Sequence, residues 1–259
     1  MSLDPVFVRD GERYVPTEGA RGPWDPGALH GGAPAALFVH AMREAVAAPE
    51  LQLARLTCEF VRPVPLAPLS VVCEVVRPGR RVTLLDARLE APRGIEVARA
   101  RGLFLVASEI GDALGGPPPF PGPSSGHAND FVADGPPMFA THAIEIRFVE
   151  GAFREVGAST AWFRLRGPLV GGEELSPFEV MAAAGDFGNG IASELSWEEH
   201  VFINPDLTLY IERPPGGEWV ALQSEMRVGP GSVAVAESVL WDEAGRIGRA
   251  TQALLVGRR

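Results

Sequence analysis

"CEFVRPVPLAPLSVVCEVV" (residues 58–76) and "LYIERPPGGEWVALQSEMRV" (residues 209–228) follow one pattern, in which an alternating apolar segment runs into Arg-Pro and a second alternating segment follows. Matching Arg62 to Arg213 gives an offset of 213 − 62 = 151, and matching Leu105 to Leu255 gives 255 − 105 = 150. One deletion in a turn reconciles the two values. Self-similarity at a fixed spacing indicates an internal duplication, so we expect two copies of one structural unit.

The segment between the two copies has the composition of a linker. Residues 110–137, IGDALGGPPPFPGPSSGHANDFVADGPP, are rich in Pro and Gly and show no apolar period. We therefore predict an N-terminal domain over residues 1–109, a linker over residues 110–137 and a C-terminal domain over residues 138–259. The sequence GPSSG at residues 122–126 fits a serine-nucleophile turn, but it lies in this linker without a predicted strand before it or helix after it, so we expect no catalytic triad there.

Each half contains the same order of elements: a short strand region, a helical stretch of small residues, and three or four strands. In the first half Leu56, Cys58 and Phe60 share one face, which is the period of an antiparallel sheet with one side buried. The helical stretches are HGGAPAALFVHAM (residues 30–42) and AAAGDFGNGIASEL (residues 182–195). One such helix per half would cover the buried face of a curved sheet, so the predicted fold class is α+β, present twice.

The composition excludes several classes of function. The chain has 259 residues, 46% of them apolar, and a net charge of −10, which predicts an acidic globular protein and argues against a nucleic-acid partner. The chain contains arginine but no lysine, which excludes lysine Schiff-base chemistry and a phosphate-binding lysine.

The sequence carries no signal for export or for a membrane. The first residues, MSLDPVFVRDGERY, have neither a basic nor an apolar targeting region, and no apolar run reaches the length of a membrane span. The two cysteines, Cys58 and Cys73, lie in apolar strand-like segments, which favours reduced thiols over a disulfide. We therefore expect a cytoplasmic protein that has no membrane partner.

Two polar residues occupy predicted core positions in the second half only. Superposing the helical stretches places Gly32 on Asp186, and aligning the last strands places Gly102 on Gln252. A buried polar side chain costs free energy unless it is hydrogen-bonded. Asp186 could cap its helix while Gln252 bonds a neighbouring backbone group, or the two could form one site. Their joint appearance favours a shared site.

The second half also carries a series of motifs: IEIRF (144–148), AWFRLRG (161–167), AAAGDFGN (182–189), LYIERP (209–214) and RATQALLV (249–256). In this order and spacing they resemble the double-hotdog acyl-CoA thioesterases of the bacterial thioesterase II type, and the resemblance covers most of the chain. It implies a tandem hotdog fold, in which each half is a curved antiparallel sheet around one central helix. It also implies hydrolysis of acyl-CoA to a free acid and CoA.

The resemblance suggests which residues would act on the substrate. In that family an Asp, a Thr and a Gln hold and activate the attacking water. Asp186, at the expected start of its helix, matches the Asp, and Gln252 matches the Gln. The position of the Thr falls on Asn204, which departs from the family pattern; Thr208 is an alternative, although it lies on the predicted solvent side.

Three residues before and at the start of the first helical stretch are candidates for contacts with the substrate. Gly31 and Gly32 would let a carbonyl oxygen approach the N–H groups of a helix N-terminus, although glycines there equally suit helix packing. His30 is either a structural turn residue or a base. The five histidines have no metal-ligand spacing, so we expect neither a metal nor another cofactor. Exposed sheet edges tend to pair, so we expect a homo-oligomer.

Two other functions stay open at this point. The hotdog fold that the resemblance implies also occurs in enoyl-CoA hydratases and dehydratases. Here GDFGNGIASEL supplies Asp186 and Asn189 without the histidine that the motif of those enzymes contains. A non-catalytic acyl-CoA binding protein is the other alternative, because the position of the family Thr has changed.

Overall fold

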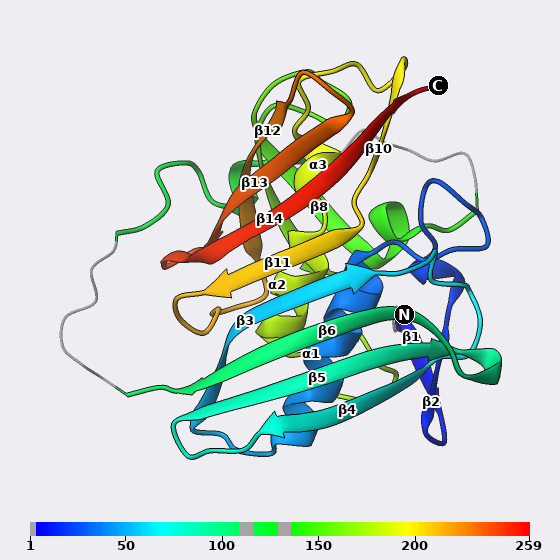
Figure 1. Ribbon diagram of the computed structural model, residues 1–259. Coiled ribbons are helices and arrows are strands. Elements are labelled where there is room, and N and C mark those ends of the chain that lie inside the picture. Colours follow the sequence, from blue (N-terminus) through cyan, green and yellow to red (C-terminus); the bar gives the residue numbers. More distant parts are fainter. Residues whose placement is uncertain (1–3, 109–115, 129–135) are drawn as a thin grey trace.

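The computed structural model describes residues 4–108, 116–128 and 136–259. One antiparallel sheet of twelve strands dominates these residues, and the helices α1 (Gly32–Val46) and α2 (Pro177–Gly185) lie against one of its faces (Figure 1). The sheet runs in the order β4-β5-β6-β3-β11-β14-β13-β12-β9-β8-β7, with β10 pairing with β14 beside β11. Strands from the two halves therefore meet at the centre of one continuous sheet.

The first half contributes one hairpin and four neighbouring strands of the large sheet. In chain order these strands are β1 (Phe7–Asp10), β2 (Arg13–Pro16), β3 (Leu51–Phe60), β4 (Ser70–Arg77), β5 (Val82–Ala91) and β6 (Ile95–Val106). Helix α1 contacts the inner face of β3, β4, β5 and β6. The predicted order of a helix followed by several strands is therefore present in this half.

The second half repeats this arrangement with additional strands. In chain order its elements are β7 (His127–Ala128), β8 (Ile144–Glu150), β9 (Ser159–Leu165), α2, α3 (Gly188–Ile191), β10 (His200–Ile203), β11 (Asp206–Ile211), β12 (Val220–Val228), β13 (Val233–Asp242) and β14 (Gly245–Arg258). Helix α2 contacts β9, β11, β12 and β13. At the junction of the halves β11 pairs with β3, with Thr208 opposite Thr57.

Part of the segment between the halves is packed on the second half. His127 and Ala128 form the edge strand β7 on β8, and the indole N–H of Trp162 donates to the carbonyl oxygen of Pro121 across 2.9 Å. Residues 109–115 and 129–135 lie outside the described residues. The division into domains of residues 1–109 and 138–259 around a linker of residues 110–137 stays a prediction.

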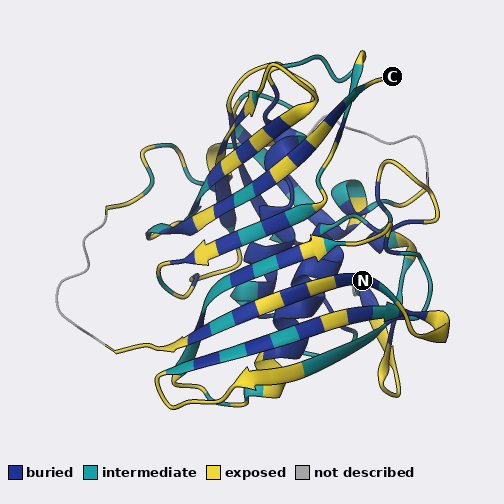
Figure 2. Ribbon diagram, in the orientation of Figure 1, coloured by how far each residue is buried: buried dark blue, intermediate teal, exposed yellow. Residues whose placement is uncertain are grey.

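Burial alternates along the strands, as the sequence predicts (Figure 2). Leu56 and Cys58 face the helices and are fully buried. Val75 and Val106, two hydrophobic strand residues of the same half, are 44% and 40% exposed. Val75 lies on the edge strand β4, and Val106 is the last residue of β6, so the helix layer does not cover them.

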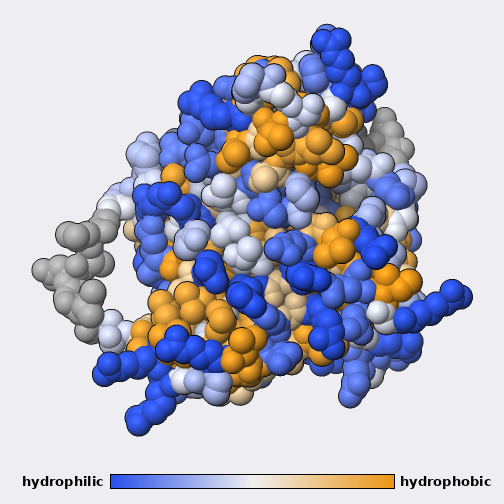
Figure 3. Space-filling view, in the orientation of Figure 1, coloured by the Kyte–Doolittle hydropathy of each residue, from blue (hydrophilic) through white to orange (hydrophobic). Residues whose placement is uncertain are grey.

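Polar side chains alternate with hydrophobic areas on the outer face of the sheet, and one hydrophobic area lies over β13 and β14 and another over the left-hand ends of β5 and β6 (Figure 3).

The area over β13 and β14 contains partly exposed side chains. In this region Val233, Val235 and Leu255 are 63%, 38% and 56% exposed. The structure contains one chain, so the expected homo-oligomer stays a prediction. In the described part of the chain, no helix combines the length and the apolar character needed to cross a membrane.

The two helices run antiparallel and touch closely. At one end, a Cβ on Gly32 would lie 2.5 Å from the carbonyl oxygen of Ala183, so only glycine allows this approach of α1 to α2. At the other end, His40 of α1 contacts Glu179 of α2 through Nδ1 and Oε1, 3.1 Å apart. The N-terminus of α1 therefore meets the C-terminus of α2.

Candidate active site

Asp186 lies just after the end of α2, so the expectation that it stands at the start of a helix is wrong. Helix α2 begins earlier, at Pro177, because Ser176 and Glu179 form a capping box that satisfies the first N–H groups. The helix ends at Gly185, Asp186 occupies the C-cap, and the short helix α3 starts at Gly188. The S-x-x-E sequence at residues 176–179 was the signal for this boundary.

The structure brings Asp186, Gln252 and Asn204 together. The side-chain amides of Asn204 and Gln252 donate to Oδ1 of Asp186 across 2.7 and 3.2 Å. Gln252 also donates to the backbone oxygen of Asp186 across 3.3 Å, and its Oε1 accepts from the N–H of Asn189. Asp186 and Gln252 are 5% and 1% exposed. Both amides are thus oriented, and the predicted proximity of the acid and the glutamine is present.

Asn204 reaches the carboxylate from the turn between β10 and β11. The neighbouring Pro205 does not disrupt this turn, because its carbonyl oxygen accepts from the N–H of Phe60 across 2.7 Å. Thr208 pairs with Thr57 and alternates with the buried Leu207 and Leu209, which places it on the outer face of the sheet. Asn204, and not Thr208, therefore occupies the third position beside Asp186.

The first half contributes the opposite wall of the site. A Cβ on Gly31 would lie 2.7 Å from Oδ2 of Asp186, so this glycine allows the carboxylate to contact the start of α1. Nδ1 of His30 lies 3.1 Å from the same Oδ2 and accepts from the N–H of Gly32 across 3.0 Å. The ring of His30 stacks on Phe187 at 4.4 Å. Of the three predicted residues, His30 and Gly31 thus adjoin Asp186, and Gly32 is bonded to His30.

Two helix ends act on the charge of Asp186. The carboxylate follows the C-terminus of α2, where the helix dipole disfavours a negative charge. It also contacts the N-terminus of α1, where the dipole favours one. Among the described residues, the N–H of Gly31 has no hydrogen-bond partner, and so it is available to a ligand. The arrangement combines a buried acid with a nearby hydrogen-bond donor.

A cavity of about 660 Å³ opens onto Asp186 and is lined by both halves of the chain. Met138, Ala140 and Phe187 form part of an apolar wall. Trp24 and Trp197, which stack at 5.4 Å, lie along the same cavity, and the guanidinium of Arg259 lies 5.6 Å from the Trp24 ring. A cavity of this volume can hold a small organic ligand with an apolar part and a polar part.

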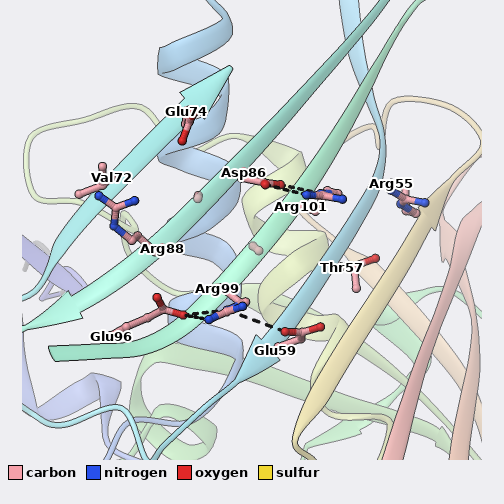
Figure 4. Close-up of a pocket in the computed structure, with 12 residues that line it drawn as sticks. Arg55, Thr57, Glu59, Val72, Glu74, Asp86, Arg88, Glu96, Arg99 and Arg101 are labelled. Carbon is pink, nitrogen blue, oxygen red and sulfur yellow. Dashed lines mark hydrogen bonds and ion pairs between the residues drawn. The ribbon is translucent and has the colours of Figure 1, made fainter. Parts of the chain in front are cut away.

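A second hollow, of about 620 Å³, lies on the outer face of the first half (Figure 4). Two ion pairs lie in it: Arg101 binds both carboxylate oxygens of Asp86 at 2.6 Å, and Arg99 contacts Glu96 at 2.6 Å. Because this hollow is on the face opposite the helices and does not include Asp186, we assign the candidate site to the cavity at Asp186.

Two neighbouring contributions to the site are not apparent from the sequence. The first is the backbone of Asn189, which fixes the amide of Gln252. The second is Gly188, because a Cβ there would lie 2.9 Å from Oγ of Ser238 and 3.0 Å from Oε1 of Gln252. The only sequence signal was the spacing of glycines after Asp186, which does not reveal which strand they approach.

Comparison with known families identifies the chain. Residues 20–105 match the N-terminal domain and residues 116–256 the C-terminal domain of a family model for acyl-CoA thioesterases. The chain belongs to the acyl-CoA thioesterase family. This confirms the predicted resemblance, and it makes the protein a thioester hydrolase. A search among curated proteins finds no match.

Solved structures support the same fold. The chain is similar to a protein from Novosphingobium aromaticivorans that is named as a thioesterase candidate, with 23% identity, a TM-score of 0.71, and 98% and 99% of the two chains covered. A hot dog fold protein from Alicyclobacillus acidocaldarius gives 19% identity, a TM-score of 0.73, and 97% and 95% coverage. An acyl-CoA thioesterase II from Mycobacterium marinum gives 16% identity, a TM-score of 0.66, and coverage of 90% of this chain and 92% of that chain. These similarities show a hotdog fold.

Proposed function

We propose that this member of the family hydrolyses acyl-CoA thioesters by direct attack of a water molecule that Asp186, Gln252 and Asn204 hold. The observation that carries the proposal is the convergence of two amide donors on one oxygen of a buried carboxylate beside the cavity. The donors hold the carboxylate in place, and Asp186 is the base. Neither a metal nor another cofactor enters this reaction.

The reaction needs few groups because a thioester is already an activated acyl group. Asp186 takes a proton from the water while the water oxygen bonds to the carbonyl carbon. The C–S bond then breaks, and the CoA sulfur takes up the proton. A positioned general base contributes about 10² to 10⁴-fold to the rate. The N–H group of Gly31 at the start of α1 would stabilise the negative carbonyl oxygen, at about 10² to 10³-fold.

We interpret the fold as a tandem hotdog in which α1 and α2 are the central helices of the two halves. Each helix contacts strands of its own half, and the two lie side by side. Under this interpretation the first half supplies the oxyanion donor, the second supplies the base, and the site requires both. The acyl group would lie along the apolar wall with Phe187, and CoA would extend past Trp24 and Trp197.

The experiment that tests the proposal measures release of CoA thiol from a panel of acyl-CoA thioesters by the parent chain and by Asp186→Asn. Asp86→Asn is the matched control, because it makes the same change on the outer face. We expect turnover by the parent and the control, and a loss of about 10² to 10⁴-fold in Asp186→Asn. Parent-like turnover by Asp186→Asn would remove this residue as the base.

The thiol assay suits this chain because its own cysteines are weakly reactive. Burial raises the pKa of the Cys58 thiol, with further contributions from Asp186 and Asp206. Burial and the nearby Glu44 raise the pKa of Cys73 to about 11. Both groups therefore stay protonated at neutral pH, and the reagent reports CoA. Tight binding of acyl-CoA without thiol release would instead show a binding protein.

A further inference from the structure

Nδ1 of His30 lies within hydrogen-bond distance of two groups that it cannot serve at once. It accepts from the N–H of Gly32 across 3.0 Å and lies 3.1 Å from Oδ2 of Asp186. As an unprotonated nitrogen, Nδ1 bonds Gly32 but faces a second acceptor in the carboxylate. As a protonated nitrogen, it bonds the carboxylate but faces a second donor in Gly32. One proton therefore decides which contact is a hydrogen bond.

The surroundings hold the ring in this position. His30 stacks on Phe187 at 4.4 Å and on Phe139 at 5.1 Å, and its side chain is 11% exposed. These aromatic neighbours carry no charge, so the carboxylate of Asp186 is the charged group in direct contact with the ring. Three further charged side chains line the cavity that the ring borders: Arg154, Glu198 and Arg259. The ring cannot turn away without losing its stacking.

We propose that His30 is a positioning residue that shares with Asp186 the proton taken from the attacking water. The inference rests on the proposed thioesterase function. In the resting site Nδ1 accepts from the N–H of Gly32 and is therefore unprotonated, so it can take a proton from Oδ2 of Asp186 at 3.1 Å. Moving the proton to Nδ1 returns the negative charge to the carboxylate, where the protonated ring stabilises it, while the N–H of Gly31 stays available to the oxyanion.

The step balances without another reactant. The O–H bond of the water breaks, its oxygen bonds to the carbonyl carbon, and the carbonyl π electrons move to oxygen. The proton passes to the carboxylate of Asp186 and on to Nδ1 of His30, which then donates to Oδ2. When the C–S bond breaks, its electrons leave with sulfur, and the proton returns through Asp186 to give the CoA thiol and the free acid.

Two substitutions separate this role from a simple helix-capping role. In His30→Asn, the amide oxygen takes the place of Nδ1 as acceptor for Gly32, but it cannot carry the proton. In His30→Ala both functions are lost. We expect His30→Asn to keep a melting temperature near that of the parent and to lose about 10²-fold in kcat. We also expect the pH profile of its kcat to move, which the loss of a cap alone would not cause.

A spectroscopic measurement tests the proton linkage without relying on turnover. In ¹H–¹⁵N spectra of the free enzyme, the amide resonance of Gly32 should shift in the same pH range as the ring nitrogens of His30. Asp186→Asn should move both transitions together. A Gly32 resonance that does not follow the His30 ring, or a His30→Asn variant with parent kcat and pH profile, would overturn the proposal. Absence of thiol release by the parent would instead contradict the proposed function.

Discussion

Replacing Gly31 by alanine tests whether the carboxylate must contact the start of α1. The backbone of Gly31 has φ −60° and ψ −25°, which alanine adopts without strain. The obstacle is the added Cβ, which would lie 2.7 Å from Oδ2 and 2.9 Å from Oδ1 of Asp186. Ordinary contact begins at 3.4 Å, so the carboxylate would have to move by about 3.4 − 2.7 = 0.7 Å.

This displacement should affect the rate much more than the stability. Asn204 and Gln252 hold Oδ1 at 2.7 and 3.2 Å, and a shift of this size stretches or breaks both bonds. A misplacement of about 1 Å costs up to about 10²-fold in rate. Alanine is a poorer N-cap than glycine by about 1 kcal/mol or less, equivalent to a few degrees in melting temperature. We therefore expect kcat to fall by about 10 to 100-fold in a folded protein.

The assay is steady-state release of CoA thiol, together with thermal unfolding of each variant. Gly216→Ala is the matched control, because its Cβ would lie 3.5 Å from a carboxylate oxygen of Asp242, at ordinary contact and outside the site. A Gly31→Ala variant with parent kcat would refute the reasoning, since the carboxylate would then tolerate displacement. A large loss in the control would show that the assay responds to general destabilisation.

Three further predictions follow from buried polar groups. Gln252→Leu should lower kcat by about 10-fold or more in the thiol assay, because Asp186 loses one donor. Asp242→Ala should lower the free energy of unfolding by about 2–3 kcal/mol in denaturant titrations, less than for a fully buried ion pair because its partner Arg213 is 36% exposed. Burial lowers the pKa of His40, but Glu179 and two further carboxylates outweigh this and raise the pKa above 6.5. The protonated His40 therefore stabilises the fold fully below about pH 6.5, and this stabilisation is lost as the pH rises through the folded-state pKa. Unfolding experiments at varied pH should show that the free energy of unfolding of His40→Gln lacks this pH dependence.

The duplication and the strand periods could be predicted because they depend on local pattern. Alternation in β3 and β14 places Cys58 and Gln252 on the inner face in both the prediction and the structure. The predicted helix start was wrong because the small residues around Asp186 were assigned to one continuous helix. The capping box at Ser176 instead starts α2 earlier, at Pro177. Composition alone does not separate the end of one helix from the start of the next.

The contacts within the site depend on distances between elements, which the sequence does not contain. Asn204 was identified only as a departure from a family pattern, and its bond to Asp186 follows from how β10 and β11 turn beside α2. The contact of His30 with the same carboxylate joins positions 156 residues apart (186 − 30), across the two halves. Only the packing of α1 on α2 creates it.

The same packing explains why the chain has its candidate acid in one copy only. Gly102 occupies in β6 the place that Gln252 has in β14, and a Cβ there would lie 2.6 Å from Sδ of Met42. The side chain of Met42 in α1 thus fills the volume that an amide side chain at position 102 would need. Gly32, aligned with Asp186, is closed off by the carbonyl oxygen of Ala183 at 2.5 Å from its Cβ position. Packing in the first copy leaves no room for a second acid and amide, and it is this close packing that brings Gly31 at the start of α1 against the single carboxylate.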